Sequence, residues 1–275
     1  MRKIIRSVLI FMAALLPFLP RSVFAAPAGL VKDPAVGYHK IIQKAEEYQI
    51  PFSMTYEEYM QAFAGSGFDS EEEYADAYLG IMEPMEIHDP DPNTKSGNSG
   101  SWYYNTGTIL PENADPVYGK TNLYETVEKG DIIFEANGGY GITGHTAIVE
   151  GKYYNAASGK KYIRIIEVIS EGVVRSCLDE TRAAERAAVI LRVKGAAPSV
   201  ISGAVSFCAG QLGARYILDF QKDTDISEQD WYCSELIWAA YYHQGIDLEG
   251  SGITEPGITP RDIKNGPLTQ IVNYR

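Results

Sequence analysis

The chain contains few cysteines, few histidines and, beyond its N-terminus, no long apolar run. Three of its 275 residues are cysteine and four are histidine. A helix needs about 20 apolar residues to cross a bilayer, so we expect no membrane span once the N-terminal segment is removed. Three is an odd number of cysteines, and at least one thiol is therefore unpaired within a monomer. The oligomeric state stays open.

Positive charge is also in short supply. The chain has 24 Lys and Arg residues against 36 Asp and Glu residues, which gives a formal net charge of -12. A surface of this sign repels the phosphate backbone, so the composition argues against nucleic acid as a partner. It leaves the substrate open, because the charge of the whole molecule is not the charge of a site.

The one apolar run lies at the N-terminus. A basic start at Met1–Arg6 is followed by apolar residues 8–19 and by small residues at Ala25 and Ala26. This order is typical of a secretory signal peptide, and we expect residues 1–25 to be removed. The alternative, a membrane anchor, is disfavoured because the run is short and is interrupted by Pro17 and Pro20. The mature protein is thus expected to be secreted, extracellular or associated with a cell wall.

The next residues predict a helical extension and a turn-rich linker, together covering 26–100. Thr55–Glu58 and Ser70–Glu73 both match the capping box, in which side chains satisfy the free N–H groups at a helix start. Residues 86–101 are rich in Pro, Gly, Asp and Asn, as is typical of a loop. We favour an extension that packs on the main domain over a separate binding module.

Residues 101–275 are expected to form the main domain. Runs of β-branched residues bounded by glycines predict strands at 131–134, 146–149, 162–169 and 187–193. Helices are predicted over 199–212, ended by Gly213, and from Cys233 to a C-terminal cap at Gly245. Strands clustered between helical segments indicate an α+β domain with an antiparallel sheet.

Cys233 is the cysteine best placed for chemistry. It begins a predicted helix, where unpaired N–H groups and the positive end of the helix dipole favour a thiolate and can hold an oxyanion. Cys208 lies among apolar neighbours in mid-helix and is interpreted as a buried structural thiol. Cys177 follows a strand, and is either inert or paired with Cys208.

A nucleophilic cysteine needs a base within hydrogen-bonding reach. His243 lies ten residues further along the same helix, about 15 Å away along the axis, which is too far. His39 and His88 belong to the extension and its loop. His145 opens a strand directly after a glycine-rich turn, a common place for a functional residue. It is the candidate base, although a structural histidine at a strand end is the alternative.

Glu167 is the candidate partner of the imidazole. Strand alternation places it on one face with Ile163 and Ile165, and a carboxylate buried among isoleucines requires a partner. A histidine N–H is a natural one and would fix the tautomer. The rival Glu150, on the strand of His145, is expected on the opposite face. If the strand edge is solvated, Glu167 is only a surface acid.

Four segments together resemble a known family: Gly130–Ile133, Gly144–Val149, Ile166–Glu167 and Tyr232–Trp238. Their order is similar to that of the circularly permuted, YiiX-like branch of the NlpC-type papain-like cysteine amidases, in which the histidine strand precedes the cysteine helix. The resemblance covers roughly residues 120–245. It implies a permuted papain-like domain, with an antiparallel sheet packed against helices.

The resemblance also implies roles for single residues. Cys233 would attack a carbonyl, His145 would activate it, and Glu167 would take the polar third place. The segment 213–216 is similar to the family's glycine-to-tyrosine segment, which would place Tyr216 near the substrate. Tyr232 is a second candidate for substrate binding. For both tyrosines, packing under the cysteine helix is the alternative.

We therefore expect a secreted thiol hydrolase that cleaves an amide bond, in a peptide or cell-wall peptide, through an acyl-enzyme. Neither a metal nor an organic cofactor is expected. Three alternatives stay open: an acyltransferase on the same site, a hydrolase of lipid amides or esters, and a non-catalytic exported binding protein.

Overall fold

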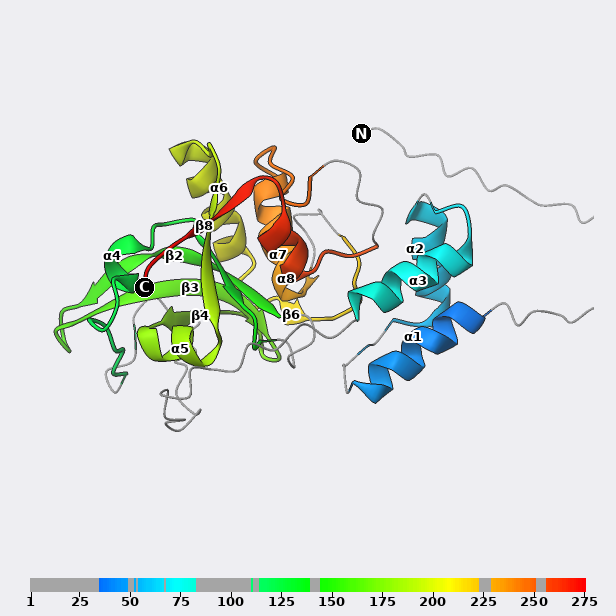
Figure 1. Cartoon of the computed structure of the whole chain (residues 1–275), viewed down its shortest axis with the longest axis horizontal. Helices are drawn as coiled ribbons and strands as arrows, with labels where there is room; N and C mark the ends of the chain where they lie inside the picture. The colour runs from blue at the N-terminus through cyan, green and yellow to red at the C-terminus, as the bar shows by residue number, and fades with distance from the viewer. Residues whose placement is uncertain are drawn as a thin grey trace, which may run out of the picture. The chain divides into compact units, whose positions relative to one another are not determined.

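A six-stranded antiparallel sheet forms the framework of the C-terminal part of the chain (Figure 1). The computed structural model describes residues 35–48, 52, 54–66, 68–82, 110, 114–138, 144–222, 229–250 and 256–275. The chain divides into Met1–Asp33 and Pro34–Arg275, and every described residue belongs to the second unit. The predicted signal peptide, the linker at 86–101 and the domain boundary near residue 100 lie outside the described residues.

The sheet has the strand order β4-β3-β2-β1-β5-β8, and every neighbouring pair is antiparallel. Its strands are β1 (Ile132–Glu135), β2 (His145–Asn155), β3 (Lys160–Ile169), β4 (Gly172–Leu178), β5 (Ala188–Val193) and β8 (Thr269–Val272). The four predicted strands are confirmed. The structure adds β4 and β8 at the two edges, and Cys177 lies within β4 rather than after a strand.

The tight turn between β3 and β4 depends on glycine. Gly172 has a φ of 101°, a left-handed conformation that residues with a side chain rarely adopt. A β-carbon there would also lie 2.3 Å from the backbone oxygen of Ala214. Val173 in turn donates its N–H to the same oxygen at 2.9 Å. The hairpin is thereby held against the segment that leads to Tyr216.

Each face of the sheet buries its own apolar cluster, because successive side chains of a strand point to opposite faces. Ile132, Ile148 and Ile166 face a large cluster that includes most of α7 (Cys233–Tyr242) and part of α6 (Pro198–Gly210). Ile133 and Ile165 face a second cluster with α4 (Leu123–Thr126) and α5 (Glu180–Glu185).

The remaining elements are short. They are the parallel pair β6 (Arg215–Tyr216) and β7 (Asp230–Trp231), and helix α8 (Pro260–Asn265). Helices α6 and α7 confirm the two predicted helices, and both end close to the predicted glycines. In the part of the chain that the structure describes, no helix is long and apolar enough to span a bilayer.

The N-terminal extension contains α1 (Val36–Glu47), α2 (Tyr56–Ser66) and α3 (Glu71–Ile81). Before α2, Thr55 and Glu58 form both bonds of the predicted capping box. Ser70 caps α3 by accepting from the N–H of Glu73 at 3.2 Å. These helices contact the main domain, since the Tyr78 hydroxyl donates to the backbone oxygen of Asp219 at 2.9 Å.

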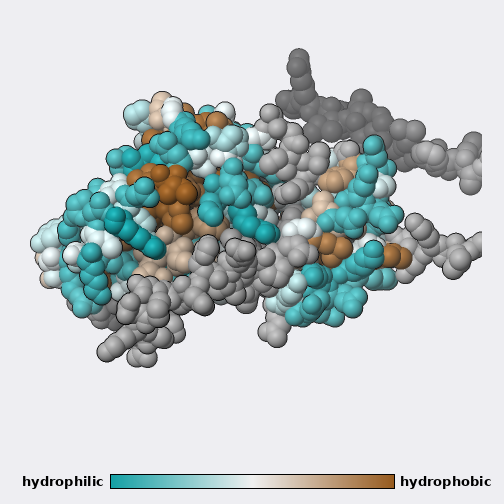
Figure 2. Space-filling view, viewed as in Figure 1, coloured by the Kyte–Doolittle hydropathy of each residue, from teal (hydrophilic) through white to brown (hydrophobic). Residues whose placement is uncertain are grey.

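The edge strand β8 leaves apolar surface exposed. Ile271 is 58% exposed, and Figure 2 shows a hydrophobic area where β8 runs across the molecule. The adjoining groove is formed by residues 187–190 of the β5 segment and by residues 271–275. It lies on a different part of the sheet from the candidate site described next.

Candidate active site

Cys233 is the first residue of α7. Tyr232 before it is extended, with φ of -108° and ψ of 168°, and donates its N–H to the Glu235 carboxylate at 3.3 Å. Eight residues of α7 are buried, which fixes the helix against the sheet. The residue as a whole is partly exposed, and it lies at the helix terminus where a negative charge is stabilised. This placement agrees with the prediction.

His145 meets this thiol from the first position of β2. It is 8% exposed and lies next to the Cys233 side chain. Burial opposes a charged imidazole, but the neighbouring Cys233 sulfur and the Glu167 carboxylate outweigh it and raise the pKa of His145 to about 10. For Cys233, burial opposes the thiolate, yet His145 and the Thr146 backbone outweigh it and lower the pKa. A thiolate–imidazolium pair is therefore favoured over the pH range between these two pKa values.

Glu167 is the third residue at the site and contacts His145. It is fully buried, and its Oε2 lies 2.7 Å from Nε2 of His145. Glu167 is paired in register with Ala147, so it is the diagonal cross-strand neighbour of His145 on the same face of the sheet. The rival Glu150 lies elsewhere, bonded to Arg164 at 2.5 Å and to Arg175 at 2.8 Å. The structure thus brings Glu167, and not Glu150, to His145.

Two residues at this site were missed by the sequence analysis. Arg182 of α5 donates to both Oε1 and Oε2 of Glu167, at 2.9 and 2.6 Å, and to Glu135 of β1 at 2.6 and 3.2 Å. Burial of Glu167 opposes its ionisation, but Arg182 first and His145 second outweigh this effect and hold the pKa of the carboxyl well below its usual range. One signal in the sequence could have pointed to Arg182. A buried carboxylate such as Glu167 needs a cationic partner, and none was assigned to it from the sequence.

A pocket of about 440 Å³ opens onto these groups. Cys233, His145 and Glu167 are part of its wall, together with both predicted substrate-binding residues, Tyr216 and Tyr232. Tyr216 is half-buried and also packs against the large apolar cluster. The structure therefore brings all five predicted site residues to one cavity.

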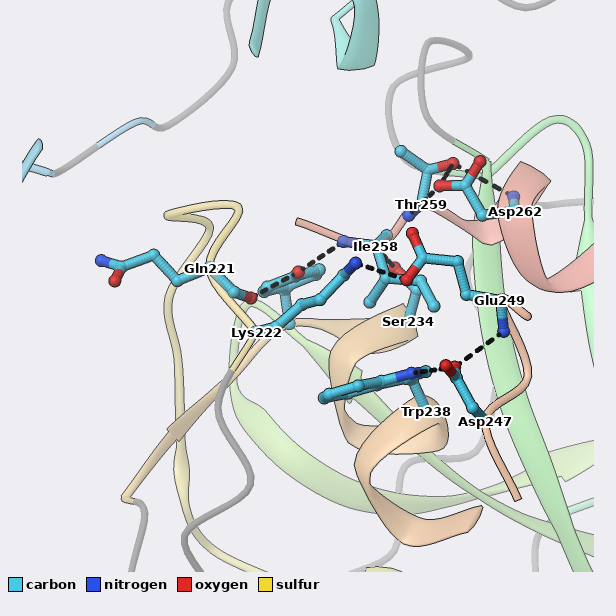
Figure 3. A network of polar contacts seen from close by, with 10 residues as sticks. Gln221, Lys222, Ser234, Trp238, Asp247, Glu249, Ile258, Thr259 and Asp262 are labelled. Carbon is cyan, nitrogen blue, oxygen red and sulfur yellow. Dashed lines mark hydrogen bonds and ion pairs between the residues drawn. The ribbon is translucent and has the colours of Figure 1, made fainter. Parts of the chain in front are cut away.

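Besides lining the cavity, the Tyr232 side chain has a structural role. Its ring is 1% exposed, and its hydroxyl donates to the oxygen of Gln221 at 2.7 Å and accepts from the N–H of Ile258 at 3.0 Å. Figure 3 shows the surrounding polar network, in which Lys222 meets Glu249 beside α7. The hydroxyl is thus occupied by backbone partners, and only the rest of the side chain is available to the cavity.

The other two cysteines do not take part. Cys177 lies on β4 near the Tyr118 hydroxyl, at 3.8 Å, and burial raises its pKa to about 12. Cys208 is fully buried in α6, and burial also raises its pKa. All three cysteines are free, so Cys177 and Cys208 are not paired. Among the residues that the structure describes, no three His, Cys, Asp or Glu side chains form a cluster that would hold a metal ion.

Comparison with known families agrees with this geometry. The model of the permuted papain-like amidase family, described as YaeF/YiiX, C92 family, matches residues 126–266, and the chain belongs to this family. The resemblance and the fold class stated from the sequence are confirmed, and the family supports a cysteine amidase or peptidase. Neither the curated proteins nor the solved structures gave a match.

Proposed function

We propose that the protein is a secreted thiol hydrolase in which Cys233 is the nucleophile, His145 the general base and Glu167 the carboxylate that orients His145. The observation that carries the proposal is the continuous contact from the Cys233 side chain through the imidazole to Glu167 at the wall of a cavity. A nucleophile, a base and an orienting group in this order are the requirements for acyl transfer to cysteine.

The proposed reaction begins with attack of the Cys233 sulfur on the carbonyl carbon of an amide. The oxyanion that forms would lie near the first N–H groups of α7, which have no partner within the helix. His145 then gives its proton to the leaving amine, and an acyl-enzyme remains. A water molecule, deprotonated by His145, attacks the acyl carbon and releases the acid and the free thiol.

We propose a peptide or a cell-wall peptide as the substrate. Export, which rests on the N-terminal segment of the sequence, would place the enzyme among such substrates. An acyltransferase would use the same residues and differ only in the acceptor that resolves the acyl-enzyme. Products formed from peptidoglycan fragments, with and without an added amine, separate the two reactions.

The first prediction concerns Cys233→Ala. Turnover of peptidoglycan fragments should be abolished while the free energy of unfolding stays within about 1 kcal/mol, because a partly exposed position at a helix start tolerates alanine. Iodoacetamide near neutral pH should alkylate Cys233 before the other two thiols, and mass spectrometry of peptides measures this order. Cys208→Ala is the control, which should keep activity.

Retained turnover in the Cys233→Ala variant would refute the assignment of the nucleophile. Equal alkylation of Cys233 and Cys208 in the folded protein would also count against it. The remaining alternative, an exported binding protein without catalysis, requires that a thiol-reactive probe fails to label Cys233.

A further inference from the structure

Arg182 lies beside the proposed catalytic groups and lines the same cavity, together with Glu135. Its side chain is 5% exposed, and those of Glu135 and Glu167 are 1% and 0% exposed. All three therefore lie away from bulk water. Arg182 is connected to His145 through Glu167, so it can affect the reaction through the imidazole.

The guanidinium bridges the two carboxylates. Nη1 and Nη2 donate to the two oxygens of Glu167, while Nε and Nη2 donate to those of Glu135. The planar group is rigid, so a bidentate contact on each side fixes the plane of each carboxylate. The Glu167 oxygen held at 2.6 Å by Arg182 is Oε2, the same atom that contacts His145. The arginine thus acts directly on the atom that orients the imidazole.

The charge of the guanidinium also decides which tautomer His145 adopts. Glu135 is paired in register with His145, and Glu167 is its diagonal neighbour, so two carboxylates face the same buried imidazole. With Arg182 between them, Glu167 stays ionised and is only a hydrogen-bond acceptor. Nε2 of His145 must then carry the proton, which leaves Nδ1 to exchange a proton with the thiol.

The fold holds Arg182 in this place by separate contacts of α5. The Asp179 side chain caps the helix by accepting from the Arg182 N–H at 2.8 Å. Glu180 accepts from the N–H groups of Gly119, Lys120 and Thr121 at 2.8–3.1 Å. The helix is therefore anchored on one side by a buried carboxylate and on the other by Arg182.

We propose, on the basis of the proposed function, that Arg182 is a positioning residue of the active site, and that its bridge between Glu135 and Glu167 holds His145 in the reactive orientation and tautomer. The charged or titratable groups around His145 are Cys233 from α7, Glu135 from β1, Glu167 from β3, Arg182 from α5, and Glu171 and Arg186 on the cavity wall.

The test compares three variants with the wild-type protein. Arg182→Met removes the bridge, Arg182→Lys keeps the charge without the bidentate fork, and Glu135→Gln/Arg182→Met removes one charge of each sign. The matched control is Arg164→Met. Arg164 lies on β3, the strand that carries Glu167, and its substitution breaks a similarly buried ion pair with Glu150 of β2. Iodoacetamide alkylation of Cys233 is measured from pH 5 to pH 10, with the hydrolysis of p-nitrophenyl acetate beside it.

In Arg182→Met, kcat should fall on the order of 100-fold with little change in KM, because a misplaced base lowers the rate and not the binding. The acid limb of the alkylation profile should move to higher pH, because loss of a cation disfavours the thiolate. Arg182→Lys should lie between this variant and the wild type. The double variant should stay impaired, because it restores the charge balance but not the orientation.

An alkylation profile of Arg182→Met that matches the wild type would overturn the inference, as would full activity of the double variant. Arg164→Met should change neither profile nor kcat, which separates positioning from general loss of a buried pair. If Arg182→Met does not fold, Arg182→Lys decides by its kcat, which should be lower than that of the wild type because the bidentate fork is lost. Absence of preferential Cys233 alkylation in the wild type refutes the proposed function itself, whereas normal wild-type labelling with unaffected variants refutes only the role of Arg182.

Discussion

At the scale of the residue, the site depends on one position where a side chain is not tolerated. A β-carbon added to Gly138 would lie 2.3 Å from the β-carbon of His145 and 3.1 Å from its backbone nitrogen. Neither neighbour is the flexible end of a side chain, so the contact can be relieved only by moving the start of β2. Any such movement displaces the imidazole from Cys233.

Gly138→Ala should therefore lower kcat on the order of 100-fold and reduce the free energy of unfolding by about 1–3 kcal/mol. Kinetics on p-nitrophenyl acetate and urea unfolding measure the two effects. Gly210→Ala is the control, because a β-carbon there meets nothing within 4 Å in α6. Unchanged kinetics in Gly138→Ala would show that the base does not need this close packing.

The placement of the candidate site residues was largely predictable from the sequence. A cysteine at a helix start, a histidine at a strand mouth and a carboxylate in an isoleucine strand each carry a local signal. Arg182 carries none, because its role depends on where α5 rests on the sheet. Glu135 was missed because the predicted strand ended at residue 134, one residue before the position that faces His145.

At the scale of the element, the N-terminal helices support the segment that lines the cavity. Phe52 forms a parallel bridge with Leu218, a cavity residue, and the Tyr78 hydroxyl bonds to the next residue, Asp219. The Tyr78 ring also packs edge-on against Phe220. The extension therefore acts on the site through residues 218–220.

Tyr78→Phe should reduce the free energy of unfolding by about 1 kcal/mol, since it removes the hydrogen bond to Asp219 and the weak one to the Met54 sulfur and keeps the ring. The expected change in Tm is a decrease of about 2–4 °C. Tyr154→Phe, at a position 67% exposed, is the control and should change stability by less than about 0.5 kcal/mol. Equal melting temperatures for both variants would show that the bond to Asp219 contributes nothing.

Strands and helices with a clear hydrophobic pattern in the sequence were predicted. Elements that form only because they pair or pack with other segments were not. The sequence of β4 contains Arg175 and Ser176, which interrupt its apolar run, and the strand exists because it pairs with seven residues of β3. Strand β8 has only four residues, and two of them are exposed. Helix α5 has six residues and depends on the contacts of Asp179 and Glu180.

At the scale of the whole molecule, buried carboxylates link stability to pH. Burial opposes the ionisation of Glu150, Glu167 and Glu180, but arginines or hydrogen bonds outweigh it and lower the pKa of each below 4.5. Groups of this kind contribute stability above pH 4.5, which is lost as the pH falls through their folded-state pKa values. Glu249 acts in the opposite sense, because burial raises its pKa to about 7, and its contribution is lost as the pH rises through that value.

The free energy of unfolding should therefore decrease as the pH is lowered below about 4.5, because the three carboxyl groups with lowered pKa values act there, whereas Glu249 acts between about pH 4.5 and pH 7. Urea unfolding at several pH values between 7 and 3 measures the slope. Glu180→Gln should give a shallower slope, because one linked carboxyl is gone. Equal stability at pH 4.5 and pH 3 would contradict the arrangement of charges described above.

The order of the catalytic segments along the chain has a consequence for biosynthesis. The strand with His145, the strand with Glu167 and the helix with Arg182 all precede α7, and β8 closes one edge of the sheet only at the end of the chain. A ribosome thus completes the proposed base and the residues that contact it before it adds the proposed nucleophile. Nascent or prematurely terminated polypeptides that stop before residue 233 therefore lack the proposed nucleophile.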